Sequence, residues 1–336
     1  MVSIKDVARR AGVSLGTVSN VINRPELVSA QKRALVRAVI EELGYVPSES
    51  ARQLRMGQSR ILGLLVLDMG NPFFVEVARG AEHAARAAGL RVMVCNSGQD
   101  PREEADYLSL FVEQRVRGVL ITPADISGVN HNGFVNHGVP FVFVDRVLPA
   151  AEGCSVSVDD VTGGALATRH LLEAGHTDIA FINGPSQLAQ CADRHEGVRR
   201  ALTEAGLAES AVTVLRVDHL DVASGRDAGA RLMGLPRRPS AVFCANDLLA
   251  LGLLQAVFAA GLRVPEDLAI VGYDDIEFAA AAAVPLTSVR QPAWQIGVTA
   301  AELVIAETGD DAGSHSHQRV VFQPELVVRR SSMPGR

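Results

Sequence analysis

The chain has 336 residues, of which 48% are hydrophobic and 21% are charged. This composition excludes a largely disordered protein and predicts about two to three well-packed domains. The formal net charge of −6 is unevenly spread, because residues 1–60 carry ten Lys or Arg and five Asp or Glu, leaving 22 against 33 for the rest. A small basic module on a large acidic body favours contact between the first 60 residues and a polyanion.

The sequence predicts no metal, cofactor or membrane partner. The cysteines lie far apart without a C-x-x-C pair, and nearby histidines do not supply a metal-ligand spacing, so reduced core thiols are expected at Cys95, Cys154, Cys191 and Cys244. The charged N-terminus is unlike a signal peptide, and the apolar run at 61–67 is too short to span a bilayer. We therefore expect a cytoplasmic protein.

Three short helices are predicted within residues 1–47. Ser3 can cap the first, Gly12 permits a tight turn after it, and Ser14 starts the second. Ser29 can cap a third helix that runs to about Leu43. The apolar residues expected in the shared core are Ile4, Val7, Ala8, Ala11, Val18, Val21, Ile22, Leu35, Val39 and Leu43. Two short helices joined by a glycine turn are typical of a helix-turn-helix domain that binds DNA.

Residues 48–60 form a separate segment between this module and the body. It contains a weak helix of about eight residues between Pro47 and Gly57, which is too short to be stable alone. We therefore expect a linker that becomes helical only with outside support.

The body, residues 61–336, repeats a strand-helix rhythm. Short apolar runs such as ILGLLVLD, IAFING and AVFCAND alternate with amphipathic segments that end in glycine. This rhythm predicts an α/β fold of parallel sheets flanked by helices, and the number of units points to two similar lobes. We place the first lobe at about 61–158 and 289–322, and the second at about 159–288 and 323–330. A ligand cleft is expected between them, at the carboxyl ends of the strands.

Polar and aromatic residues recur at these strand ends. Carboxylates, amides and guanidinium groups can pair with neighbouring hydroxyl groups, and an aromatic ring can cover the C–H side of a sugar. Taken singly, each residue could also be structural, as a helix cap or an ion pair, so the recurrence carries the prediction. The candidate effector-binding residues are Asn71, Phe73, Phe74, Asp145, Arg146, Asp160, Arg194, Leu220, Asn246, Asp274 and Gln291.

The motifs IKDVARRAGVSLGTVSNVIN and GYVPSESARQL, followed by this body, strongly resemble the LacI/GalR family of transcriptional regulators. The resemblance implies that the second helix lies in the major groove and that a hinge helix in 48–60 folds when two subunits meet over an operator. It implies base contacts from Leu15, Gly16 and Asn20, and phosphate contacts from Ser14, Thr17 and Ser19. Leu54 would be the wedge in the minor groove. The remaining DNA-binding candidates are Asn23, Ser29, Ala51, Arg52 and Arg55.

The body resembles the periplasmic sugar-binding proteins and the ribose-type regulators. Regulators that bind purines tend to carry an aromatic residue where this chain has Arg146. Two positions depart from the ribose type, because Asp160 replaces a usual asparagine and Leu220 stands where many relatives have an aromatic residue. The resemblance therefore implies a ribose-like or other monosaccharide as the effector.

We predict a homodimeric repressor that binds a pseudo-palindromic operator and responds to this sugar. The expected dimer surface includes the helix from Val75 to Ala88 and the segment 278–284. The alternatives are a purine- or nucleoside-responsive regulator and a sugar-binding transport protein, although the latter needs no basic module. An enzyme is not expected, because no catalytic motif occurs in its proper context, and His170 and His176 are interpreted as surface residues.

Overall fold

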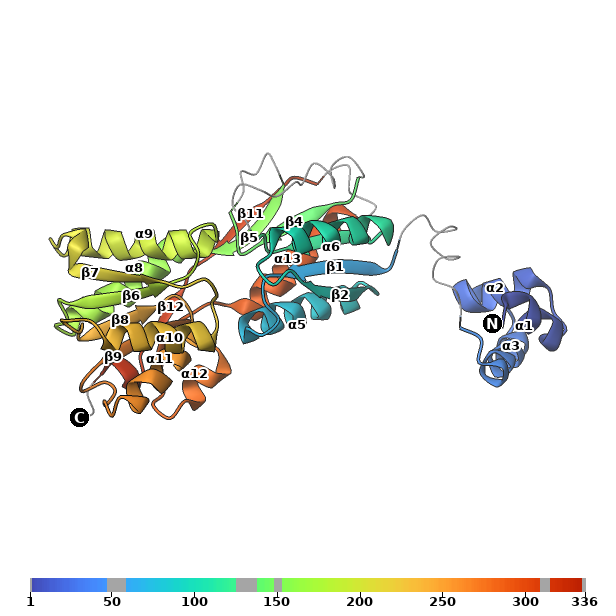
Figure 1. Ribbon diagram of the computed structural model, residues 1–336. Helices are drawn as coiled ribbons and strands as arrows, with labels where there is room; N and C mark the ends of the chain where they lie inside the picture. The colour runs from blue at the N-terminus through green and yellow to red at the C-terminus, as the bar shows by residue number, and fades with distance from the viewer. Residues whose placement is uncertain (1, 47–58, 125–137, 148–152, 309–314, 334–336) are drawn as a thin grey trace. The chain divides into compact units, whose positions relative to one another are not determined.

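The computed structural model describes residues 2–46, 59–124, 138–147, 153–308 and 315–333 (Figure 1). It divides into an N-terminal unit that ends at Ser59 and a body from Arg60 to Arg336. The predicted hinge residues Ala51, Arg52, Leu54 and Arg55 lie outside the described residues. Among the described helices, none has the length and apolar character needed to cross a membrane.

The N-terminal unit contains the predicted three helices, α1 (Ile4–Ala11), α2 (Leu15–Asn23) and α3 (Ala30–Leu43), with a 3-10 turn at Pro25–Leu27. The carboxylate of Asp6 accepts hydrogen bonds from the backbone N–H and the hydroxyl of Ser3, which fixes the start of α1. Gly12 ends α1 with a φ of 63°, a left-handed conformation that glycine adopts without strain. The turn between α1 and α2 is therefore encoded locally.

One core residue of this unit was predicted wrongly. Val36 is fully buried, whereas the side chain of Leu35 is 48% exposed. The inward stripe of α3 is Val36, Val39, Ile40 and Leu43, which follows the i, i+3, i+4, i+7 rule without Leu35. Spacing within the helix, rather than side-chain size, decides which residue is buried.

The first lobe of the body is built on a six-stranded sheet whose pairings are all parallel. Its strand order is β11-β5-β4-β3-β1-β2. The strands are β1 (Ile61–Val66), β2 (Arg91–Asn96), β3 (Gly118–Ile121), β4 (Phe141–Val144), β5 (Cys154–Val158) and β11 (Arg319–Phe322). The fully buried apolar strands β3 and β4 match the pattern expected for a sheet covered on both faces.

The second lobe is built on another six-stranded sheet with the order β12-β10-β9-β8-β6-β7. It is parallel except for β12, which runs antiparallel to β10. The strands are β6 (Ile179–Asn183), β7 (Val212–Arg216), β8 (Ala241–Cys244), β9 (Ala269–Asp274), β10 (Thr287–Arg290) and β12 (Glu325–Val327). Each lobe therefore has its own sheet and its own apolar core.

The helices of the body pack in pairs, α5 with α13, α8 with α9, and α10 with α11. Glycines of both members meet the partner's backbone at each crossing, which allows a close approach. The bounds are α5 (Pro72–Ala87), α6 (Pro101–Glu113), α8 (Asp160–Glu173), α9 (Ala189–Glu204), α10 (Val222–Met233), α11 (Asp247–Ala259), α12 (Glu277–Ala281) and α13 (Ala293–Glu307).

The chain passes between the lobes after β5, after β10 and after β11. Because β10 belongs to the second sheet through Arg290, the second passage follows that residue, close to the position of about 289 estimated from the sequence. These passages bring the carboxyl ends of strands from both sheets to one cleft, as parallel α/β architecture requires.

Candidate functional site

The second helix of the N-terminal unit has one buried and one accessible face. Val18 and Val21 are buried, and Leu15 at the leading end is 45% exposed. The hydroxyl of Ser14 accepts a hydrogen bond from the Thr17 backbone N–H at 3.1 Å and lies 2.9 Å from the Thr17 hydroxyl. Ser14 therefore caps α2 in addition to its predicted phosphate contact.

Gly16 lies in open space on the accessible face. A Cβ atom added there would meet only the Ser14 hydroxyl oxygen, at 3.8 Å. Asn20 is half-buried, and the Asn23 side chain donates to the Ser19 carbonyl oxygen at 2.9 Å. Ser29 precedes α3 and is exposed. The predicted DNA-binding residues of 14–23 thus lie on or beside α2, whose free face is unobstructed at Gly16.

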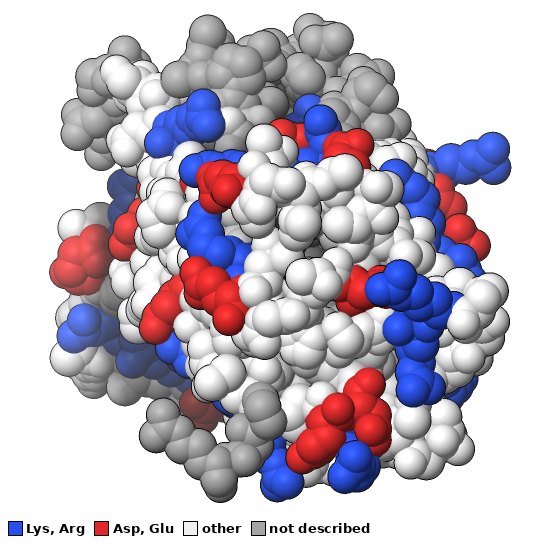
Figure 2. All heavy atoms as spheres, turned by 90° about the vertical axis from the view of Figure 1, so that its left-hand side faces the viewer, with Lys and Arg blue, Asp and Glu red and all other residues white. Residues whose placement is uncertain are grey.

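The body presents a different charge pattern from the basic N-terminal module. Figure 2 shows one face of the body, the side at the left of Figure 1, with Lys and Arg groups beside Asp and Glu groups. Exposed ion pairs such as Arg200–Glu204 at 3.0 Å are part of this mixed surface chemistry. The face in view therefore offers no continuous positive surface of the kind that DNA phosphates need.

A cavity of about 380 Å³, including its mouth, lies between the two lobes. Most of the predicted effector residues line it, from both lobes and from the passage after β10. Its lining consists of Leu67, Asp68, Asn71, Phe73, Phe74, Gln99 and Asp145 from the first lobe, Gln190, Arg194, Leu220, Asn246 and Asp274 from the second, and Gln291.

Asp274, which lines this cavity, links the two lobes. Its carboxylate accepts hydrogen bonds from the Asn71 amide at 3.0 Å and from the Gln291 amide at 2.8 Å. Asn71 also caps α5, because its side-chain oxygen accepts from the Phe73 backbone N–H at 3.0 Å. The structural role of Asn71 and its place in the site are therefore compatible.

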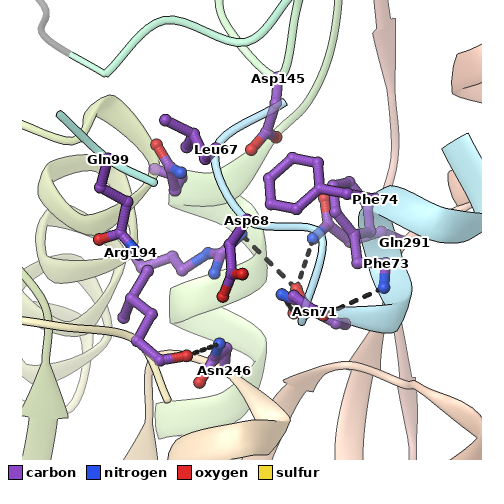
Figure 3. Close-up of a pocket in the computed structure, with 13 residues that line it drawn as sticks. Leu67, Asp68, Asn71, Phe73, Phe74, Gln99, Asp145, Arg194, Asn246 and Gln291 are labelled. Carbon is purple, nitrogen blue, oxygen red and sulfur yellow. Dashed lines mark hydrogen bonds and ion pairs between the residues drawn. The ribbon is translucent and has the colours of Figure 1, made fainter. Parts of the chain in front are cut away.

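Three carboxylates at strand ends have left-handed backbone, with φ of 59° at Asp145, 100° at Asp274 and 53° at Asp275. Non-glycine residues adopt this region at a cost, and such strain is often found at functional sites. Figure 3 shows Asp145 reaching the cavity from above, Arg194 from the left, and Phe74 and Gln291 from the right. The cavity is thus surrounded by polar groups on several sides and by an aromatic ring on one.

Arg194 is held rigidly at the cavity wall. It donates from Nε to Asp160 at 2.8 Å and from Nη1 to the Ala245 carbonyl oxygen at 2.6 Å, and its guanidinium carbon lies 3.7 Å from the centre of the Tyr273 ring. Asp160 is therefore placed behind Arg194 and is not part of the lining. Arg146 lies over the Phe143 ring at 5.8 Å and is also outside the cavity lining.

The burial of the acidic groups changes their proton affinity. Burial, together with the charge of Asp160, raises the pKa of Asp145 well above its ordinary value. Burial also raises the pKa of Asp274, although Arg194 opposes this shift. Among the described residues, Asp145 Oδ1 and the side-chain oxygens of Gln291 and Gln99 are buried without a hydrogen-bond partner. The cavity therefore has acceptors for the donors of a ligand.

Four lining residues were missed by the sequence analysis, namely Leu67, Asp68, Gln99 and Gln190. Asp68 follows the first strand closely and could have been found by the strand-end rule already applied to Asp145. Gln190 lies one helical turn before Arg194 on α9, so it shares a face with that residue. Gln99 gave no comparable signal, because its position depends on a loop with a φ of 66° at this residue.

Family models match both parts of the chain. The model described as "Bacterial regulatory proteins, lacI family" matches residues 3–48, and the model of a "Periplasmic binding protein-like domain" matches residues 168–332. Among curated relatives, an HTH-type transcriptional repressor PurR of Vibrio campbellii is 36% identical over 334 residues, which cover 98% of each chain.

Two solved structures align over nearly the full length. The transcriptional regulator CelR in complex with cellobiose is 32% identical, with a TM-score of 0.74 over 99% of this chain and 100% of the other. The lac repressor dimer bound to operator and the anti-inducer ONPF is 27% identical, with a TM-score of 0.82 over 99% of each chain. The resemblance found in the motifs thus extends to the whole fold.

Proposed function

The chain belongs to the LacI family and is a DNA-binding transcriptional repressor, and from this premise we propose that it is a cytoplasmic homodimer whose operator binding is controlled by a monosaccharide bound between the lobes. The observation that carries the effector proposal is the set of polar groups around the cavity, in which Asp274 accepts hydrogen bonds from Asn71 and Gln291. The similar proteins are named as transcriptional repressors or regulators rather than as enzymes.

Operator contact is proposed for the accessible face of α2. Leu15 can contact a thymine methyl group and Asn20 can pair with adenine, while Gly16 leaves room for the backbone to approach the groove floor. A single short helix that contacts bases through one amide side chain discriminates only modestly between DNA sequences. Leu54 in the hinge is therefore proposed as a second determinant of specificity, which deforms the central base step.

A two-fold symmetric dimer is proposed because two recognition helices must address two half-sites at a fixed spacing. The body exposes apolar side chains near α5 and α12 that a partner subunit could cover, and their exposed fractions are 37% for Val75, 49% for Phe278 and 41% for Trp294. Val75 and Trp294 also line a common surface hollow with residues at the ends of β9 and β10. The operator-bound lac repressor to which this chain is similar is a dimer.

A sugar suits the cavity because each hydroxyl group both donates and accepts. The buried acceptor oxygens of Asp145, Gln291 and Gln99 require donors, and Arg194 supplies donors in return. Phe74 can cover the C–H side of a sugar ring. CelR, which is similar over its full length, is solved with cellobiose.

A purine is the second candidate effector, and the similarity to a repressor named PurR favours it. A planar base would stack on the pair formed by Phe73 and Phe74, whose ring centres lie 5.0 Å apart. Leu220, however, which also lines the cavity, offers no aromatic ring to complete a sandwich. The side chains that line the cavity therefore favour a monosaccharide over a purine.

Operator binding is tested with the full chain and a pseudo-palindromic operator selected from random DNA. We expect binding with a steep salt dependence, much weaker binding to a half-site, and loss of binding when residues 1–57 are removed. Leu54→Ala should weaken operator binding and leave effector binding unchanged. Equal affinity for operator and random DNA would contradict specific readout.

Effector binding is tested by calorimetric titration of the full chain with a panel of monosaccharides, purine bases and nucleosides. We expect one monosaccharide to bind, and Asp274→Asn to weaken it by about 10-fold or more, because a charged hydrogen-bond acceptor is lost. Asparagine keeps the left-handed backbone accessible. The control is Asp227→Asn on the exposed side of α10. Binding of a purine alone would replace the sugar proposal with the second candidate.

A further inference from the structure

A second polar cluster lies in the first lobe, away from the effector cavity. It consists of Cys154, Glu307, His315 and His317, whose ligating atoms all lie within 4.8 Å of one another. Cys154 begins β5, Glu307 ends α13, and the two histidines precede β11. The side chains of Glu307 and His315 are each 9% exposed, and Cys154 is fully buried.

From this geometry we propose that Cys154, Glu307, His315 and His317 bind one transition-metal ion, with Zn²⁺ as the best match. The four donors are a thiol, a carboxylate and two imidazoles, which are the ligand types that Zn²⁺ takes in four-coordinate sites. Sequence spacing could not reveal the set, because Cys154 is far from the other three along the chain.

The distances fit a tetrahedral ion. Cys154 Sγ lies 3.2 Å from His315 Nε2 and 3.8 Å from His317 Nδ1. Glu307 Oε1 lies 3.2 Å from His315 Nε2 and 3.1 Å from His317 Nδ1. Metal–ligand bonds of about 2.0–2.3 Å around a tetrahedral centre separate the ligand atoms by roughly 3.3–3.8 Å. Small side-chain adjustments would therefore admit the ion.

The surroundings hold the donors in place. The Gln318 backbone N–H donates to Cys154 Sγ at 3.3 Å, a contact that stabilises a thiolate. Arg117 donates from Nε to the Thr308 hydroxyl and from Nη2 to the Thr308 carbonyl oxygen, each at 3.0 Å, and so anchors the chain beside Glu307. Hydrogen bonds to Cys154 and to Thr308, the residue after Glu307, thus hold two of the four proposed ligands in place.

The position of the cluster gives the ion a structural role. β5 and β1 are parallel strands of one sheet, so Cys154 lies at the edge where the chain enters β1 at Ile61, opposite the edge that bears Asp145. An ion there would tie the end of α13 and the start of β11 to β5. It would therefore stabilise the first lobe without occupying the effector cleft.

The experiment titrates the metal-free full chain with Co²⁺, then displaces it with Zn²⁺. We expect a thiolate-to-cobalt charge-transfer band that saturates at one ion per chain and disappears on addition of Zn²⁺. Cys154→Ser should remove this band, and His317→Ala should weaken Co²⁺ binding by about 10-fold or more. The 43% exposed His317 side chain can be removed with little risk to the fold.

The controls are Cys95→Ser and His219→Ala, which remove a thiol and an imidazole elsewhere and should leave the band and the affinity unchanged. Zn²⁺ should also raise the unfolding temperature of the wild type, and should raise that of His317→Ala by less at the same Zn²⁺ concentration. No charge-transfer band in the wild type, or the same band and affinity in Cys154→Ser and His317→Ala, would overturn the proposal in favour of a hydrogen-bonded cluster.

Discussion

Asp274 is the residue at which the two lobes are most directly connected across the cavity. It ends β9 of the second sheet, yet it accepts a hydrogen bond from Asn71, which begins α5 of the first lobe. The Asn71–Asp274 contact depends on the relative placement of the lobes, so a ligand that competes for the Asp274 carboxylate favours one placement over another. Effector binding can therefore be coupled to the relative placement of the lobes through the side chain of Asp274.

Gly16 provides a prediction at the residue scale. Gly16→Leu should reduce operator affinity by about 10-fold or more, because the added side chain would occupy the space needed for the groove floor. It should not destabilise the fold, since the position is open and leucine favours helix by up to about 1 kcal/mol over glycine. Anisotropy titration and thermal unfolding measure the two effects separately.

The matched control is Ala38→Leu, an exposed position on α3. Operator affinity should be unchanged by this substitution. If Gly16→Leu lowers stability and leaves operator affinity intact, the glycine is structural and the assignment of α2 to the groove is wrong at this position.

His170 provides a second residue-scale prediction. Burial lowers its pKa from the ordinary value of 6.5, while the nearby Glu173 opposes the shift and His176 adds to it. The folded chain therefore takes up this proton at lower pH than the unfolded chain. The contribution to stability is fully present above the ordinary pKa and is lost as pH falls through and below it.

We expect the urea midpoint of the wild type to fall between about pH 7.5 and about pH 5.5, and to fall less in His170→Gln. Glutamine can retain a hydrogen bond to the Ser332 hydroxyl, which lies 2.7 Å from His170 Nε2. The control is His219→Gln in an exposed position. An identical pH dependence in wild type and His170→Gln would contradict this contribution.

At the scale of elements, the body depends on helix pairs that cross at glycines. In the α10–α11 pair, a Cβ atom on Gly252 would overlap the Val222 carbonyl oxygen and the Arg226 amide. Backbone atoms cannot move aside as the end of a flexible side chain can. Close packing of the paired helices therefore requires glycine at the crossing.

Gly252→Ala should lower the free energy of unfolding by about 1–3 kcal/mol, because it overpacks this crossing. Gly234→Ala is the matched control at the end of α10, where the added atom would lie 3.5 Å from the Arg231 oxygen in ordinary contact. Urea unfolding measures both. If the two substitutions cost the same, the crossing is not the reason for glycine at position 252.

The predictability of the elements follows the range of the interactions that determine them. The helix cap at Ser14 is local, so the sequence pattern identified it. The antiparallel pairing of β12 with β10 and the cluster of Cys154 with residues 307–317 depend on contacts between distant segments. Leu35 was assigned to the core of α3 together with Val39 and Leu43, but the structure buries Val36 in its place.

Most residues that the sequence placed in the cleft from their position at strand ends do line the cavity, whereas Asp160 and Arg146 do not. The end of a parallel strand faces the cleft whatever the side chain, so Asp145 and Asp274 could be assigned from pattern alone. Asp160 and Arg146 also occur at such ends, but their side chains turn toward Arg194 and Phe143. Side-chain direction depends on packing partners that a sequence pattern does not specify.

At the scale of the whole molecule, two units and two charge patterns correspond to two tasks. The basic N-terminal unit binds DNA, and the body has a polar cleft between sheets connected by three passages of the chain. A bound effector changes operator affinity only by as much as it prefers one lobe arrangement over the other. Regulation by an effector therefore depends on coupling of the cleft to the operator.

The most direct test is a titration of operator binding by the full-length protein, with and without each monosaccharide and purine of the panel. We predict that one monosaccharide changes operator affinity by about 5- to 150-fold, and that Asp274→Asn binds operator without effector as the wild type does but loses this change. If a sugar binds and operator affinity stays constant, or if Asp274→Asn responds as the wild type does, the proposed coupling through the cleft is wrong.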